Sequence, residues 1–172
     1  PDPHHPFTPP GKYWDMYDPR SVVLPETFGP DGPGDNPLKR ALHEELRQGH
    51  RPAGSSRAMA VTEEEARWAI ALNYGSLALI DDAVGRLTSY LNRQGLTDNT
   101  LIIYTSDHGD FMGDHGLLNK GPLHYRSLIR VPFIWADPRA PNALRDNRLC
   151  SSIDLGTSIL ARAGIEKAHG MK

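Results

Sequence analysis

The sequence predicts an α/β fold in which helices flank a mostly parallel sheet, and three observations support this prediction. A long helical pattern over residues 62–95 precedes an apolar run at 101–105, which is typical of a strand. A second apolar run at 131–135 and a helical pattern over 154–164 follow, and such alternation indicates a sheet covered by helices. The first strand opens into a polar, Gly-rich loop, and ligand sites in these folds lie beyond the carboxyl ends of strands.

The N-terminal segment is rich in proline, with ten of the 15 prolines in residues 1–37. Proline fixes φ and removes a backbone donor, so this segment cannot form a helix or a central strand. Its aromatic residues argue against a disordered linker, which is usually poor in them. We therefore predict an ordered loop region that lies over a larger body, with a short edge strand at 22–24.

A short helix is predicted over 38–48, followed by a flexible connector at 51–58 that has the composition of a loop. The next helix begins at Thr62, because Thr62 and Glu65 can form a capping box. Apolar residues then recur at helical spacing as far as Leu91, and Gly95 is a plausible stop. A kink is expected at 73–75.

Composition limits the class of protein. A chain of 172 residues is long enough for one domain with a real core, although few strands can be counted for a sheet of this kind. The net charge of -2 gives no indication of nucleic acid as a partner. No apolar run approaches the roughly 20 residues that span a bilayer. The compartment stays open.

The chemistry is concentrated in the run Thr105-Ser-Asp-His-Gly-Asp-Phe-Met-Gly-Asp-His-Gly116, followed by Lys120. It comes directly after the predicted buried strand. Hard divalent cations prefer carboxylate oxygen, so Asp107 is a candidate ligand with His108 beside it. Asp-His-Gly alone could equally be an ordinary turn, and Lys120 alone an ordinary surface lysine.

This run resembles the sulfatase family of the alkaline phosphatase superfamily, in which Ser-Asp-His-Gly is followed by Gly-x-His-Gly and a lysine. The segment Asp2-Pro-His-His-Pro-Phe7 resembles the family's Pro-His-x-Pro-Phe, and the resemblance runs from there to Ile165. It implies an alkaline-phosphatase-like sandwich and hydrolysis of small-molecule or carbohydrate sulfate esters. It also implies one divalent cation, calcium before magnesium or manganese, and a formylglycine nucleophile.

The resemblance also assigns roles to individual residues. It makes Asp107 and His108 the metal ligands, and His4, Lys120 and His108 the catalytic groups. His5 and His124 are expected to contact the substrate. Arg126 departs from the family, which often has an acidic residue there.

Three further loop residues are expected to be structural. His115 is predicted to orient the Asp107 loop through a hydrogen bond. Asp110 and Asp114 are predicted to be solvated rather than extra ligands.

We expect the chain to be part of a larger catalytic domain. The family's Cys/Ser-x-Pro-x-Arg nucleophile motif is missing, and Cys150 is followed by Ser151-Ser-Ile-Asp154. The upstream half of the same domain is therefore the expected partner, and these residues alone should not turn over substrate. The alternatives are a phosphonate monoester or phosphodiester hydrolase, and a non-catalytic metal-binding or structural fragment.

Overall fold

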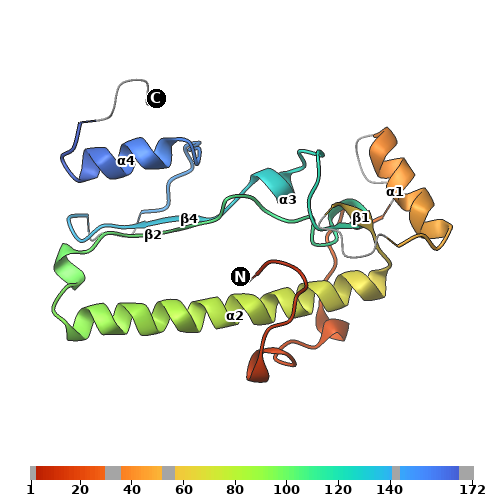
Figure 1. Cartoon of the computed structure of the whole chain (residues 1–172), viewed down its shortest axis with the longest axis horizontal. Helices are drawn as coiled ribbons and strands as arrows, with labels where there is room; N and C mark the ends of the chain where they lie inside the picture. The colour runs from red at the N-terminus through yellow and green to blue at the C-terminus, as the bar shows by residue number, and fades with distance from the viewer. Residues whose placement is uncertain (1–2, 30–35, 52–56, 141–143, 167–172) are drawn as a thin grey trace. The chain divides into compact units, whose positions relative to one another are not determined.

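A computed structural model of the chain describes residues 3–29, 36–51, 57–140 and 144–166 (Figure 1). The chain divides into two compact units, residues 1–138 and 139–172. The first unit holds every described element except the last helix. Its helices are α1 (Pro37–Arg47), α2 (Glu63–Arg93) and α3 (Arg126–Ile129), and its short 3-10 turns are η1 (Gly11–Tyr13), η2 (Pro19–Ser21), η3 (Thr97–Asn99) and η4 (Asp114–Gly116).

The described strands form two antiparallel pairs. β2 (Ile102–Thr105) pairs with β4 (Phe133–Ala136), and β1 (Met59–Ala60) pairs with β3 (Leu117–Leu118). The mostly parallel pairing expected from the sequence therefore does not occur among the described strands. The second strand begins at Phe133 rather than 131, since Pro132 cannot donate to the ladder.

Two strand expectations need correction. All four residues of β2 are half-buried rather than buried, because β4 is their only strand neighbour among the described residues. Residues 22–24 form no strand. Val22 is instead buried against Ile70 and Ala71, and its carbonyl oxygen accepts a hydrogen bond from the Arg67 guanidinium.

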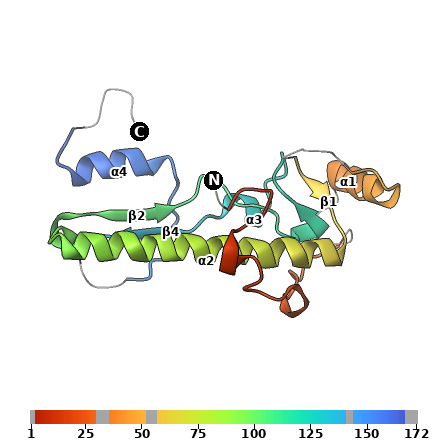
Figure 2. The same ribbon diagram turned by 60° about the horizontal axis from the view of Figure 1, so that its bottom comes forward.

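Helix α2 begins at the predicted capping box. The Glu65 amide donates to Thr62 Oγ1 over 3.3 Å, and the Thr62 amide donates to Glu65 Oε2 over 2.8 Å. The helix ends before Gly95, which has φ +66°. The kink expected at 73–75 is absent, and α2 is one uninterrupted helix (Figure 2). Gly75 serves a different purpose, because a Cβ there would lie 2.1 Å from the carbonyl oxygen of Tyr13.

The proline-rich segment lies along α2. Tyr13 OH and Lys12 Nζ both donate to Asp82 Oδ2, over 2.5 and 2.9 Å. These bonds hold residues 9–22 against the helix, together with the hydrogen bond from Arg67 to Val22 O and the close approach of Tyr13 O to Gly75. The connector predicted at 51–58 is tied at both ends, by Arg51 to Glu65 and by buried Ala58, while 52–56 lie outside the described residues.

The main hydrophobic cluster surrounds the loop that follows β2. It joins α1, β1, the loop and α3 through Leu42, Ala58, Ala60, Phe111, Leu117, Leu123 and Leu128. In the second unit, α4 (Asp154–Arg162) is followed by Gly164 with φ +72°. None of the helices in the described ranges has the length and apolar character needed to span a bilayer.

Candidate metal and ester site

Strand β2 delivers Asp107 to the surface. Its side chain is 84% exposed, and its Oδ1 accepts hydrogen bonds from the His108 amide (2.9 Å) and the Ser106 hydroxyl (3.3 Å). The bond from the His108 amide is the main reason that the pKa of Asp107 lies below its usual value. The carboxylate is therefore ionised at neutral pH, and these two donors bond to its Oδ1 rather than its Oδ2.

The His108 ring completes a pair of ligand atoms. His108 Nδ1 lies 2.8 Å from the carbonyl oxygen of Gly109, so Nδ1 carries the proton and Nε2 has a free lone pair. His108 Nε2 lies 3.6 Å from Asp107 Oδ2. Two ligands at right angles around a cation about 2.3–2.6 Å away are roughly 3.3–3.7 Å apart, so this pair fits one divalent cation.

The pair by itself is too small to hold a divalent cation. In the described ranges of the chain, no group of three or more His, Cys, Asp and Glu side chains could hold an ion. Calcium takes six to eight oxygen ligands, and a smaller cation needs about six. A cation bound by this pair would need further ligands from outside the described residues or from substrate and water.

Close contacts fix the conformation of the loop backbone that follows His108. Gly109 donates its amide hydrogen to Leu128 O over 2.7 Å, and a Cβ at Gly109 would lie 1.9 Å from Ser127 O. Met112, His115 and Asn119 have φ of 44°, 55° and 66°. A left-handed conformation costs a non-glycine residue about 1–2 kcal/mol, so the surrounding contacts must hold the loop in place.

Backbone hydrogen bonds close the loop on itself. Phe111 N donates to Asn119 O over 3.0 Å, and Gly113 N donates to Leu117 O over 2.8 Å. Lys120 follows at the end of this loop and forms a β-bridge with Arg57. The closed loop thus fixes Lys120 relative to His108.

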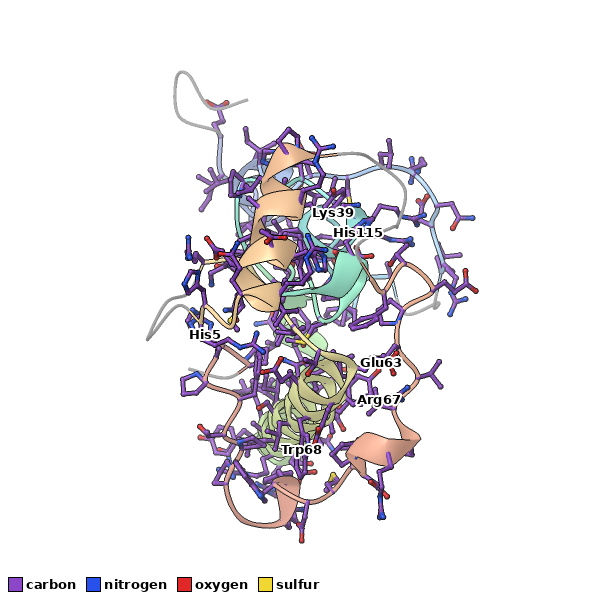
Figure 3. The ribbon with its side chains drawn as sticks, turned by 90° about the vertical axis from the view of Figure 1, so that its right-hand side faces the viewer. His5, Lys39, Glu63, Arg67, Trp68 and His115 are labelled. Atoms are coloured by element: carbon purple, nitrogen blue, oxygen red, sulfur yellow. The ribbon has the colours of Figure 1, made fainter. Side chains whose placement is uncertain are left out.

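Of the two N-terminal histidines, His5 lies within electrostatic range of Lys120. Burial lowers the pKa of His5, and the charges of His4 and Lys120 lower it further. The rings of His4 and His5 are 4.1 Å apart, and His4 Nδ1 lies 2.7 Å from His5 O. The structure therefore places His4 against His5, and His5 close enough to Lys120 for the charge of Lys120 to affect it; Figure 3 labels His5.

Within the described residues, His124 is not linked to the other candidate residues. It is exposed, between buried Leu123 and half-buried Tyr125, and none of the contacts given by the described residues joins it to His4, His5 or Lys120. The prediction that His124 contacts the substrate gains no support from its contacts.

The two loop aspartates predicted to be solvated are not. Asp110 is half-buried, and burial raises its pKa to about 6, an effect that the amide hydrogens of Met112 and Asn119 and the charge of Lys120 partly oppose. Asp114 accepts hydrogen bonds from the Thr27 hydroxyl and, over 2.6 Å, from the Ser127 hydroxyl. Both carboxylates therefore stabilise the loop from within.

His115 has a structural role, but not the one predicted. Its ring is 5% exposed and stacks on Tyr125 with 3.9 Å between centroids. Its Nδ1 has no hydrogen-bond partner in the described part of the chain, and its Nε2 lies 3.7 Å from Asp114 Oδ1, beyond hydrogen-bond distance. The carbonyl oxygen of His115 instead lies 2.9 Å from His43 Nε2.

Sequence reasoning missed His43. It lies on α1, far from the motif, and shares one face of that helix with buried Lys39 and Leu42. The i, i+4 spacing of Lys39 and His43 beside a core leucine is the signal that could have drawn attention to a buried polar face.

Comparisons with known proteins identify the family. The family model for Sulfatase matches residues 3–165. The multifunctional alkaline phosphatase superfamily protein PehA of Trinickia caryophylli is 36% identical over 138 residues, covering 78% of this chain and 27% of that protein. The arylsulfatase of Clostridium perfringens is 34% identical over 136 residues, covering 79% of this chain and 26% of that protein.

Solved structures agree. The phosphonate monoester hydrolase of Agrobacterium radiobacter has a TM-score of 0.71 and 29% identity, covering 96% of this chain and 34% of that one. The chain thus spans about a quarter to a third of the length of these relatives. The similarity confirms the predicted alkaline-phosphatase-like α/β fold as a partial domain. On the family match and these identities, the chain belongs to the sulfatase family.

Proposed function

We propose that the protein is a hydrolase of small-molecule or carbohydrate sulfate esters, and that these residues supply the later half of its active site. The observation that carries the proposal is the exposed pair Asp107 and His108 at the end of β2. The same closed loop carries Lys120, and the charge of Lys120 lowers the pKa of His5. An upstream part of the same catalytic domain is the proposed partner.

Asp107 and His108 are the proposed ligands of one divalent cation. Calcium is the first choice because the family resemblance implies it, and magnesium and manganese, which carboxylate oxygen also suits, are the alternatives. A bound cation would stabilise negative charge on an ester oxygen. Asp107 fits this role because it is ionised and its Oδ2 is open.

Lys120 and the histidines are proposed to act on the leaving group. The Lys120 ammonium offsets charge on the sulfate and on the departing oxygen. His4 donates a proton to the departing alcohol, and His5 and His124 contact the substrate. Because burial and the nearby His4 and Lys120 lower the pKa of His5, the neutral form is favoured, and His5 suits a binding role better than that of an acid.

The nucleophile is proposed to lie outside these residues. The family resemblance implies a formylglycine made from Cys or Ser, whose hydrated form would attack sulfur. The Cys/Ser-x-Pro-x-Arg motif that carries it does not occur in the 172 residues.

Hydrolysis of phosphonate monoesters is the second candidate. It is favoured by two solved structures titled phosphonate monoester hydrolase, from Agrobacterium radiobacter and Silicibacter pomeroyi, each with a TM-score of 0.71. A cation and a lysine would serve either ester, so the two reactions must be separated by assay.

The test uses the intact natural polypeptide that contains this chain. Its peptides are first examined by mass spectrometry for formylglycine. Turnover of 4-nitrophenyl sulfate and of 4-nitrophenyl phenylphosphonate is then measured with calcium, magnesium or manganese and with chelator. We expect formylglycine, a higher kcat/KM for the sulfate, and loss of activity on chelation.

Asp107→Asn is the decisive variant, with Asp98→Asn, an exposed aspartate in η3, as its control. Loss of a metal ligand should lower kcat/KM by at least about 100-fold. This is more than the loss expected when a residue that only hydrogen-bonds to a ligand is removed. Asp98→Asn should leave it unchanged. A higher kcat/KM for the phosphonate would replace the first candidate with the second, and an Asp107→Asn protein with wild-type activity would overturn both.

A further inference from the structure

Helix α1 reaches the loop that carries the proposed metal ligands through one buried hydrogen bond. His43 is 7% exposed, and its Nε2 lies 2.9 Å from the carbonyl oxygen of His115. Because a carbonyl oxygen can only accept, His43 Nε2 must be the donor. The bond joins residues 72 positions apart in the sequence, so it is a tertiary contact.

The bond falls at a left-handed turn of the loop. His115 has φ 55° and Gly116 has φ 68°, which places two left-handed residues in succession. A Cβ at Gly116 would lie 2.7 Å from the His43 ring, so the ring packs directly against the loop backbone. His43 therefore fixes the turn by a hydrogen bond and by contact at once.

Contacts lead from this turn back to the proposed ligands. Asp114, beside His115, accepts a 2.6 Å hydrogen bond from the Ser127 hydroxyl. The Ser127 carbonyl oxygen leaves no room for a side chain at Gly109, which is joined to Leu128 O by a 2.7 Å hydrogen bond. Gly109 follows His108 directly and accepts the hydrogen bond from its ring.

Lys120 is joined to the same turn from the other side. Gly113 N donates to Leu117 O, and Phe111 N donates to Asn119 O. Asn119 Nδ2 in turn donates to Arg57 O over 3.2 Å. The turn at His115 thus lies between the residues that hold His108 and those that hold Lys120. Figure 3 labels His115 beside Lys39 of α1, whose charge contributes to lowering the pKa of His115.

We propose that His43 is a positioning residue for the metal site, acting through its hydrogen bond to the carbonyl oxygen of His115. The proposal rests on the proposed function only in taking Asp107 and His108 as metal ligands. It requires no particular ester.

The test compares three variants of the intact protein. His43→Leu removes the donor but keeps an apolar side chain of similar reach. His43→Gln places an amide donor near the position of Nε2. Leu46→Ala removes packing one turn further along the same helix, from a side chain that packs against the hydrophobic cluster and makes no hydrogen bond to the turn at His115. Calcium and manganese affinities are measured by competition with a chromophoric chelator, beside kcat and KM.

We expect His43→Leu to weaken metal affinity by about 10- to 100-fold, the range seen when a group behind the ligands is lost. At saturating metal, kcat should fall more than KM rises. Amide hydrogens of Gly113 and Gly116 should also exchange faster in the metal-free protein. His43→Gln should restore most of the affinity, and Leu46→Ala should lower thermal stability while leaving the affinity of the folded protein unchanged.

The outcomes separate this proposal from the proposed function. If Asp107→Asn abolishes metal binding while His43→Leu does not alter it, positioning by His43 is wrong and the site stands. If His43→Leu and Leu46→Ala weaken affinity equally, or Gln fails to rescue, His43 contributes only to stability. If Asp107→Asn leaves affinity unchanged, the proposed ligand pair itself is wrong.

Discussion

His115 illustrates how its surroundings set the protonation of a single side chain. Burial lowers its pKa below 6.5, the nearby charge of Lys39 lowers it further, and Asp114 opposes both. His43 of α1 and Tyr125, which directly precedes α3, also pack against this turn. The folded protein therefore holds His115 neutral at a pH where an unfolded chain takes up a proton.

This difference predicts a loss of stability in mild acid. The contribution of neutral His115 to the free energy of unfolding is fully present above pH 6.5. It is lost as the pH falls below 6.5 toward the lowered pKa of His115 in the folded state. One proton changes the free energy of unfolding by at most about 1.4 kcal/mol per pH unit. Urea unfolding between pH 7.5 and 5 measures it.

The control is His115→Asn, because asparagine tolerates the left-handed conformation and does not titrate. The variant should be less stable at pH 7.5, where it loses the ring stacking on Tyr125, but its stability should fall less steeply with acid. Parallel pH profiles for the two proteins would contradict the assignment to His115.

The residues of the motif could be predicted from the sequence because they are contiguous with a strand end. Asp107 and His108 lie at the end of β2 as expected, and Lys120 lies in the same closed loop. Asp114 and His43 could not be predicted, because their partners Thr27 and His115 are 87 and 72 positions away. No local pattern encodes such contacts.

At the scale of elements, local signals located helices better than strands. The capping box fixed the start of α2, since Thr62 and Glu65 bond within one turn. Thr62→Ala should lower the free energy of unfolding by about 1 kcal/mol, as loss of an N-cap does. Denaturant unfolding measures the loss, and Thr62→Ser, which keeps the hydroxyl, should recover most of it. Equal losses in the two variants would mean that the methyl group, rather than the cap, matters.

Strand pairing and helix interruptions depended on neighbours that the sequence does not reveal. The orientation of β4 beside β2 follows from the path of residues 106–132, not from the apolar pattern of either strand. The kink expected at 73–75 rested on the low helix propensity of glycine. In the structure Gly75 leaves α2 straight and makes room for the carbonyl oxygen of Tyr13.

At the scale of the first unit, the close approach of the Tyr13 carbonyl oxygen to Gly75 helps to hold the proline-rich segment on α2. Gly75→Ala would place a Cβ 2.1 Å from Tyr13 O, so the segment must move and its bonds to Asp82 should weaken. We expect a loss of about 1–3 kcal/mol in the free energy of unfolding. Calorimetry or urea unfolding measures it.

Gly85→Ala is the matched control on the same helix. Nothing lies within 4 Å of a Cβ at Gly85, so alanine should stabilise the helix by up to about 1 kcal/mol. Opposite signs at the two positions are expected. Stabilisation by both substitutions would mean that residues 9–13 do not press on α2.

The sequence by itself determined the fold class, the start and end of α2, and the contiguous motif with its nearby lysine. These features depend on interactions within a few residues: helical periodicity, a capping box, and polar groups directly after a strand. Only the tertiary structure decided which buried groups support the loop, how β2 and β4 pair, and why position 75 is glycine. Those features depend on atoms that folding brings together from distant positions. Such contacts produce no periodic or local pattern in the sequence from which they could be predicted.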